Sequence, residues 1–447
     1  MKKIGNSPAF IITYFALGGI VGGYLLMAIA GAAPFLMKDF SLSADQFSTL
    51  AGLILLGGVI AKVVLLVSDH FGRKTMIYLN ILLFIVGILI FTTADSYTGL
   101  YIGRLIQGAG AIMSTVLFNV YLSEIAPSNK RGMMVLIFQL SWTAGMLIAS
   151  LVNLGLEQTG NWQLMFNSIL IIPIIMLFTT HLLPASPRWL ALKGRMDEAN
   201  ESLKALNSNM PKDELQAEMD MLAAGSGKVD WSQSFKLLFK YKKAIFLAVA
   251  VYVLTQLSGI NAIMQTSVIL LKSCGIQSDF MAIFGTILLA AINFIMTIGT
   301  IIFVERIGRK KILKIGITGF AVSMIALAII VAVLPAVALT GWLALVCMLS
   351  GVGFLAFGPT GVVYVILVEV LPTPIRTLGF IIGGFIGLLV GTVFVSEFLV
   401  IGTTFGYPVL FGMLAFFAIV YLLFCIFLLP ETGGKSLEEI ESEMNKK

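Results

Sequence analysis

Asp69-His70-Phe71-Gly72-Arg73-Lys74, in the first half of this chain, recurs in the second half as Glu305-Arg306-Ile307-Gly308-Arg309-Lys310. A second polar pattern is doubled in the same way, because Glu124-x-x-Pro127-x-x-x-Arg131 is followed later by Glu369-x-x-Pro372-x-x-x-Arg376. All four copies lie between long apolar runs. A repeat of apolar spans separated by matching polar loops is typical of membrane transporters built from two related halves.

The composition indicates a membrane protein. Hydrophobic residues make up 58% of the 447 positions, charged residues make up 12%, and the mean hydropathy is +0.99. A soluble domain carries about twice this charged fraction. Apolar runs of roughly 20 helical residues cross a hydrocarbon core of about 30 Å. None of the runs alternates polar and apolar residues as a barrel strand does, so we expect an all-α membrane protein with twelve transmembrane helices in two six-helix halves. The runs lie near 10-37, 47-67, 75-93, 100-122, 133-154, 163-183, 244-271, 280-304, 312-334, 341-368, 378-402 and 406-430.

The positions of the basic residues predict the orientation. If the N-terminus is cytoplasmic, Lys38 and Lys272 fall outside, Lys62 and Arg104 fall within predicted spans, and every other Lys or Arg is cytoplasmic. This asymmetry follows the positive-inside rule and accounts for the net charge of +6 without a nucleic-acid partner. We expect an integral plasma membrane protein with both termini in the cytoplasm, and the short external loops favour a bacterial inner membrane.

One long polar insertion separates the halves. Within it, the stretches 195-206 and 212-219 are amphipathic, and we expect surface helices there. The expected parts are an N-terminal six-helix half (1-183), a cytoplasmic linker (184-243), a C-terminal six-helix half (244-432) and a cytoplasmic tail (433-447).

The sequence offers little chemistry beyond transport. Cys274, Cys347 and Cys425 lie in or beside apolar runs, two of them in positions expected to be buried, and their spacing indicates neither disulfides nor a metal site. We find no nucleophile with a matching base and no phosphate-binding glycine motif. We therefore expect no enzyme, no cofactor and no metal.

Four amides within predicted spans are candidates for substrate binding: Gln139, Gln256, Asn261 and Asn293. An amide both donates and accepts hydrogen bonds, as does each hydroxyl of a polyol. Ser258-Gly259, between two of these amides, is expected to loosen its helix, as in the broken helices of transporters. Hydrogen bonding between helices is the alternative role.

Several motifs, in order along the chain, resemble those of the sugar porters of the major facilitator superfamily. The resemblance extends from the first span to the tail. It implies the twelve-helix fold, transport of a sugar or polyol by alternating access, and a sugar site lined at the positions of the span 5 and span 7 amides. The motifs are Gly103-Arg104 with Gly108-x-Gly110, the Glu124 motif beginning at Tyr121, Pro184-Ala185-Ser186-Pro187-Arg188-Trp189 with Ala185 where Glu is usual, Gln256-Leu257-Ser258-Gly259-Ile260-Asn261, and Pro430-Glu431-Thr432-Gly433-Gly434.

The chain also departs from the family pattern. Thr255 stands where a first Gln is usual, and Gln265-Thr266 replace a pair of tyrosines. The tryptophans that the family tends to carry in spans 10 and 11 are missing. Sugar rings commonly stack on such aromatics, so a plain hexose is not assured as the substrate. Tyr24, Trp142, Phe357 and Tyr364 are the aromatic residues that we consider as substitutes.

The doubled charges are expected to form a gate on the cytoplasmic side. Ion pairs between helix ends would hold this gate closed and break when it opens. Each exposed pair contributes about 0–1 kcal/mol, but several together bias a two-state equilibrium. Charge that only sets topology is the alternative. The residues are Asp69, Arg73, Glu124, Arg131, Glu305, Arg309, Glu369 and Arg376.

Proton coupling is an open question. The proton-linked members that this chain resembles carry an Asp directly after a Tyr in span 1, where this chain has Leu25 after Tyr24. Arg104 has three possible roles: it reaches the outer interface, it pairs with Glu397 as a titrating group, or it binds an anionic substrate. Lys62 is expected to extend to the lipid headgroups.

We therefore predict facilitated diffusion of a small polyhydroxylated solute by a protein that functions as a monomer in the lipid bilayer. A proton-coupled symporter of a sugar or organic anion that uses Arg104 and Glu397 is the alternative. A solute sensor without flux is a third possibility, disfavoured by the short tail.

Overall fold

The computed structural model describes residues 7–66, 71–125, 131–206, 240–372 and 375–431, together with a few positions between 213 and 237. Twelve segments in this described part are long and apolar enough to cross a membrane. Each lies within a few residues of a predicted apolar run, so the prediction of twelve transmembrane helices is confirmed.

Six spans form the first half. They are α2 (Pro8–Asp39), α3 (Ala44–Leu66), α5 (Arg73–Thr92), α6 (Tyr97–Ile125), α7 (Arg131–Leu156) and a segmented sixth span made of α8 (Trp162–Asn167) and α9 (Ile171–Thr179) with short 3-10 turns.

Six further spans form the second half. They are the broken span α14 (Lys242–Leu257) and α15 (Ile260–Ser273), then α16 (Asp279–Ile307), α17 (Arg309–Val333), the broken span α18 (Ala338–Phe357) and α19 (Pro359–Val370), α20 (Arg376–Phe405) and α21 (Tyr407–Phe427).

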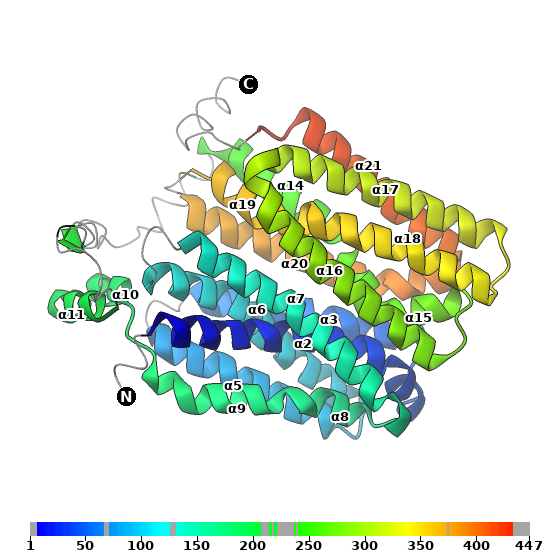
Figure 1. The fold of residues 1–447 in the computed structure, drawn as a ribbon, viewed down its shortest axis with the longest axis horizontal. Coiled ribbons are helices and arrows are strands. Elements are labelled where there is room, and N and C mark those ends of the chain that lie inside the picture. The colour runs from blue at the N-terminus through cyan, green and yellow to red at the C-terminus, as the bar shows by residue number, and fades with distance from the viewer. Residues whose placement is uncertain are drawn as a thin grey trace.

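The two halves lie side by side, the first in blue to green and the second in lime to red (Figure 1). Contacts between them run mainly through three helix pairs: α2 with α15, α3 with α20, and α7 with α16. Small residues allow close approach at the α3–α20 contact, where a Cβ at Gly52 would lie 2.3 Å from the Ser396 hydroxyl. Ser48 on α3 also donates a hydrogen bond of 2.6 Å to the carbonyl of Val395 on α20.

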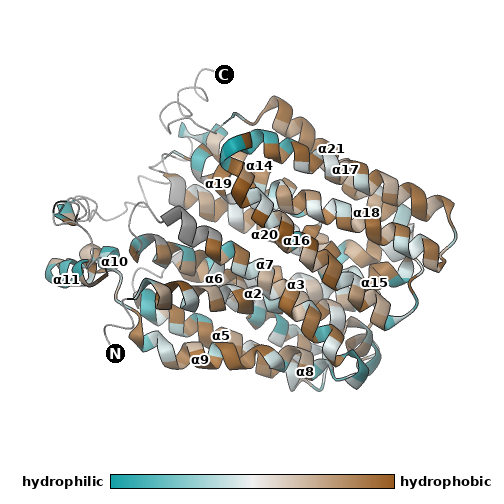
Figure 2. Ribbon diagram, in the orientation of Figure 1, coloured by the Kyte–Doolittle hydropathy of each residue, from teal (hydrophilic) through white to brown (hydrophobic). Residues whose placement is uncertain are grey.

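The two ends of the bundle differ. Helices α10 (Pro187–Leu192) and α11 (Met196–Leu206) lie beyond the spans at one end, which we call the linker end (Figure 1). We call the opposite end the far end. The spans are mainly hydrophobic along their length, whereas α11 and the helix ends carry hydrophilic residues (Figure 2). The described parts of the doubled motifs lie at the linker end, where Gly72 and Gly308 immediately precede α5 and α17.

The break in the seventh span is the feature that positions the candidate site. Helix α14 ends at Leu257 and α15 begins at Ile260. Gly259 between them has a φ of +76°, a left-handed conformation that glycine adopts without steric cost. The expected loosening of this helix at Ser258-Gly259 is confirmed.

The linker begins with two short helices. Ser186 caps α10 by accepting a hydrogen bond of 3.1 Å from the backbone N–H of Trp189. Helix α11 confirms the helix expected over 195-206. The predictions for 212-219 and for the tail fall mostly or wholly outside the described residues.

The cysteines are placed as expected. Cys274 and Cys425 are buried. Burial raises the pKa of the Cys274 thiol, just beyond α15, to about 12. This thiol is therefore protonated and unreactive at neutral pH.

Candidate functional site

Two of the predicted amides meet at the break between α14 and α15. The Nδ2 of Asn261 donates a hydrogen bond of 3.0 Å to the Oε1 of Gln256. Both side chains are half-buried. A Cβ at Gly391 on α20 would lie 3.0 Å from the same Gln256 oxygen, so this amide lies directly against the α20 backbone.

A third amide, Gln265, extends this pair toward the first half. Its Nε2 donates to the carbonyl of Asn261 at 3.3 Å. Its Oε1 accepts a hydrogen bond of 2.8 Å from the Nη2 of Arg104 on α6. A connected set of polar groups therefore runs from Gln256 through Asn261 and Gln265 to Arg104, and its last bond crosses from one half to the other.

Arg104 is fully buried, with 0% of its surface exposed. Its Nη1 donates to the carbonyl of Leu25 at 2.7 Å and to Gln107 at 3.1 Å, and its Nε donates to the carbonyl of Leu50 at 3.4 Å. Of the three roles considered for Arg104, the one in which it reaches the outer interface is not the arrangement in this structure. Carbonyl and amide oxygens from four helices satisfy the guanidinium inside the bundle, which reduces the cost of burying it.

Glu397 is not brought to Arg104. It lies on α20 with an exposed side chain and is absent from the hydrogen bonds of Arg104. The pairing of Arg104 with Glu397 is not formed in this structure.

The other predicted substrate residues lie apart from this set. The hydroxyl of Tyr24 donates to the carbonyl of Met165 in the sixth span, so it points into the first half. Asn293 is buried on α16, with its side-chain oxygen 3.5 Å from the Thr297 hydroxyl. Gln139 is half-buried on α7. Of the predicted amides, only Gln256 and Asn261 are in direct contact.

Lys62 does not extend to the headgroups, which corrects the sequence-based expectation. Only 4% of its surface is exposed. Its Nζ lies 5.3 Å from the centroid of the Phe380 ring on α20, and a Cβ at Gly384 would lie 2.3 Å from that nitrogen. The stem lies in the groove that Gly384 leaves open, so Lys62 forms a cation–π contact between the halves near the linker end.

The first doubled cluster forms a compact ion pair at the linker end. The Nη2 of Arg73 lies 2.7 Å from Glu124 Oε1, and the side chains of the pair are 9% and 4% exposed. Ser186 donates a hydrogen bond of 2.7 Å to the other oxygen of Glu124. The residue that caps α10 therefore also binds this carboxylate, which joins the linker to α5 and α6.

The second cluster divides its arginine between two carboxylates. Arg309 lies 2.9 Å from Glu305, whose side chain is 73% exposed, and 3.3 Å from Glu369. Within the part of the chain that the structure describes, the second oxygen of Glu369 is buried without a hydrogen-bond partner. Glu431 accepts a hydrogen bond of 3.4 Å from the backbone N–H of Lys310 at the start of α17.

Three predicted gate residues cannot be placed in these clusters. Asp69 lies outside the described residues, as do the side chains of Arg131 and Arg376.

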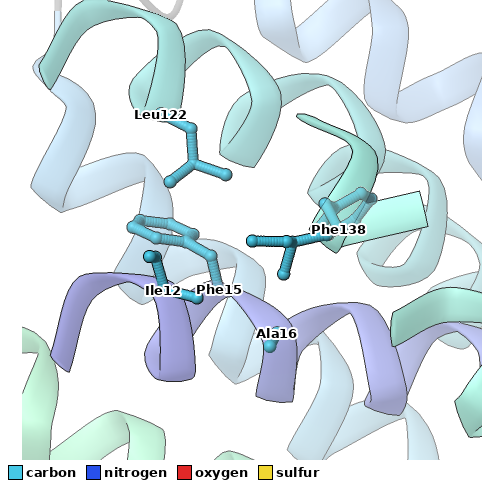
Figure 3. A pocket seen from close by; sticks show the side chains of 6 residues that line it. Ile12, Phe15, Ala16, Leu122 and Phe138 are labelled. Atoms are coloured by element: carbon cyan, nitrogen blue, oxygen red, sulfur yellow. The ribbon is translucent and has the colours of Figure 1, made fainter. Parts of the chain in front are cut away.

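A small pocket lies elsewhere in the first half (Figure 3). It is formed by α2, α6 and α7 toward the linker end, and its lining is apolar, so it offers a polyol no hydrogen bond. It is separate from the amide set. The lining residues are Ile12, Phe15, Ala16, Leu122, Ile137 and Phe138.

Sequence reasoning missed Gln265, Gln107, Ser186 and the inter-half contact of Lys62. Gln265 stands out in the sequence as a departure from a tyrosine pair. It is also an amide within a span, which is the same signal that marks the four substrate candidates. The contacts of Ser186 and Lys62 depend on residues distant in the sequence, and no local pattern marks them.

The fold can be compared with solved structures. The chain matches the inward-open structure of the xylose transporter XylE from E. coli with a TM-score of 0.80 and 24% sequence identity, over 97% of this chain and 99% of that one. That transporter is a member of the major facilitator superfamily. The two six-helix halves therefore have the fold of that transporter.

Sequence comparisons identify the family. The chain is 31% identical to the glucose transporter GlcP of Staphylococcus epidermidis over 97% of this chain and 96% of that protein. It is 27% identical to the galactose-proton symporter of Escherichia coli K12 over 100% of this chain and 97% of that protein. Residues 11–444 match the family described as "Sugar (and other) transporter", and the chain belongs to this family. Its members are transporters, not enzymes.

Proposed function

We propose that this protein carries a small sugar or polyol across the membrane by facilitated diffusion. The amides Gln256 and Asn261 support a polyhydroxylated substrate, because each offers a donor and an acceptor where the two halves meet. We propose that Gln139, Asn293 and Tyr24 complete the site in other steps of the cycle. Relatives that carry glucose and galactose favour the same class of substrate.

The environment of Arg104 is the observation that favours facilitated diffusion. The carbonyl of Leu25 accepts its hydrogen bond, at the position where the proton-linked pattern has an Asp. A leucine binds no proton, and the exposed Glu397 lies apart from the guanidinium. The connected set from Gln256 to Arg104 consists of amides, carbonyls and one guanidinium, so it has no carboxylate to carry a proton between the two sides.

Alternating access would then follow from movement of residues 1-183 against residues 244-432. We propose that the linker end is cytoplasmic, that the protein acts as a monomer in a bacterial inner membrane, and that the Arg73 and Arg309 clusters form the cytoplasmic gate. Asp69, Arg131 and Arg376 belong to this proposal by their place in the doubled motifs.

A proton-coupled symporter is the second candidate, and the galactose-proton symporter among the relatives favours it. In this case Glu397 would approach Arg104 in another conformation and titrate there, and an organic anion is a possible substrate. This alternative predicts that Arg104→Gln abolishes binding and that external acidity accelerates uptake.

The test is uptake of labelled D-glucose, D-xylose and myo-inositol into liposomes, with and without an inward proton gradient. Equilibration of one solute at the same rate under both conditions is the expected result. Accumulation only with the gradient would replace facilitated diffusion by symport. No flux of any of the three would contradict the sugar proposal and favour an organic anion.

A further inference from the structure

We propose that Gln265 is a positioning residue that couples occupation of the sugar site to closure of the far end. It would do so through its hydrogen bond to Arg104. This inference rests on the proposed function, because it takes Gln256 and Asn261 as sugar ligands.

The bond between Gln265 and Arg104 crosses the interface of the two halves. Gln265 belongs to α15 in the second half, and Arg104 belongs to α6 in the first. Both side chains are 0% exposed, and the distance between Nη2 and Oε1 is 2.8 Å. A hydrogen bond to a charged group is worth more than a neutral one. When the far end opens, α6 and α15 separate and this bond must break.

Every other hydrogen bond of Arg104 is made within the first half. Leu25, Leu50 and Gln107, all in the first half, accept its remaining hydrogen bonds. The guanidinium therefore stays with the first half as the halves move. Gln265 is the acceptor through which the second half binds it.

Gln265 is also joined to the sugar site. Its Nε2 donates to the Asn261 carbonyl, and the Asn261 side chain donates to Gln256. A hydroxylated ligand at these amides competes for the Asn261–Gln256 bond. Because α15 is a separate helix that begins at Ile260, after Gly259, a shift of its first turn moves Gln265 relative to Arg104. Sugar binding and far-end closure are thus linked through one short helix.

The experiment measures far-end opening directly. Spin labels are placed at Lys38→Cys and Gln277→Cys, exposed positions near the ends of α2 and α15, with the three native cysteines replaced by Ala. Distances between the labels are recorded by pulsed electron paramagnetic resonance, without ligand and with saturating D-glucose, D-xylose or myo-inositol. Exchange of the same solutes is measured in liposomes.

Three variants distinguish coupling from packing. Gln265→Met removes the acceptor at similar size, and we expect the closed-to-open ratio without ligand to fall about tenfold. We also expect sugar to change the distance between the labels less than in the unsubstituted protein. Gln265→Glu replaces the bond by an ion pair, and we expect a far end that stays closed with and without sugar, with slow exchange. Gln107→Met removes another Arg104 bond within the first half, and we expect the sugar response to persist.

Distances and sugar responses in Gln265→Met and Gln265→Glu that match the unsubstituted protein would overturn the proposal. Equal loss of closure in Gln265→Met and Gln107→Met would also overturn it. The loss would then follow from removing any hydrogen bond of the buried Arg104, not from the contact across the halves. If no solute changes the distance in any protein, the proposed substrate class fails. The ligand-free ratio in Gln265→Met still tests the contact across the halves in that case.

Discussion

The two charge clusters at the linker end come from the same doubled motif, yet they are built differently. In the first half, Arg73 is paired with Glu124, both side chains are nearly buried, and Ser186 binds the second oxygen of Glu124. In the second half, Arg309 is shared between the exposed Glu305 and Glu369, and the second oxygen of Glu369 has no hydrogen-bond partner among the described residues.

The comparison shows that a repeated motif specifies which residues form a pair but not how strongly they interact. A buried, fully hydrogen-bonded pair is costly to break by removing one partner, because the other charge is left buried. A pair with one exposed member is screened by solvent and contributes little. We therefore expect the first cluster to be the stronger one, and the predictions below test this inequality.

The largest effect is expected from Glu124→Gln. It removes the carboxylate from a nearly buried ion pair, at a cost of roughly 3–5 kcal/mol. We expect a clear fall in the midpoint of thermal unfolding of the purified protein and loss of most sugar uptake. An unfolding midpoint close to that of the unsubstituted protein would contradict the burial argument.

Ser186→Ala is expected to have the next largest effect. It removes a hydrogen bond to the Glu124 carboxylate, worth about 1.5–3 kcal/mol, and the N-cap of α10. We expect a lower unfolding midpoint and faster proteolysis within the linker. Ser186→Thr is the control, because it keeps the hydroxyl. If the two variants behave alike, the hydroxyl is not the cause.

Glu369→Gln should cost about 1 kcal/mol or less, because Arg309 keeps its contacts with Glu305. We expect a smaller fall in the unfolding midpoint than for Glu124→Gln, measured in the same detergent and salt. Glu198→Gln breaks the exposed pair between Glu198 on α11 and Arg195 just before it, and serves as the reference for an ion pair that contributes little to stability. Equal effects of Glu124→Gln and Glu369→Gln would remove the proposed asymmetry.

The smallest effect is expected from Ala185→Glu. This substitution gives the first half a carboxylate at the position where the second half has Glu431. Pro184-Ala185-Ser186 corresponds in the repeat to Pro430-Glu431-Thr432, and Glu431 accepts from the N–H of Lys310 at the start of α17. A carboxylate near the start of a helix contributes about 0.3–1 kcal/mol. We expect a small rise in the unfolding midpoint that shrinks at high salt. A fall would mean that the two halves differ in backbone path here.

Much of the architecture was predictable from the sequence, since apolar runs long enough to span a bilayer permit few alternatives to helices. The break at Ser258-Gly259 was also predictable, because glycine carries its conformational freedom wherever it stands. Lys62 and Arg104 were not. Lys62 was expected to reach the headgroups, and three roles were open for Arg104. Both are buried, because Gly384 leaves room for Lys62 and the carbonyls of Leu25 and Leu50 accept hydrogen bonds from Arg104.

The candidate site also has a part that the sequence predicts and a part that depends on the tertiary structure. Gln256 and Asn261 are five residues apart, and the sequence alone marks them as polar groups on one broken helix, which the structure brings into contact. Gln265 gains its role only from a partner 161 residues away. The sequence by itself determined the membrane fold, the two related halves and the amides of the seventh span, because these depend on local hydropathy and motif spacing. Only the tertiary structure decided which buried charge meets which acceptor, because that depends on how the two halves pack together.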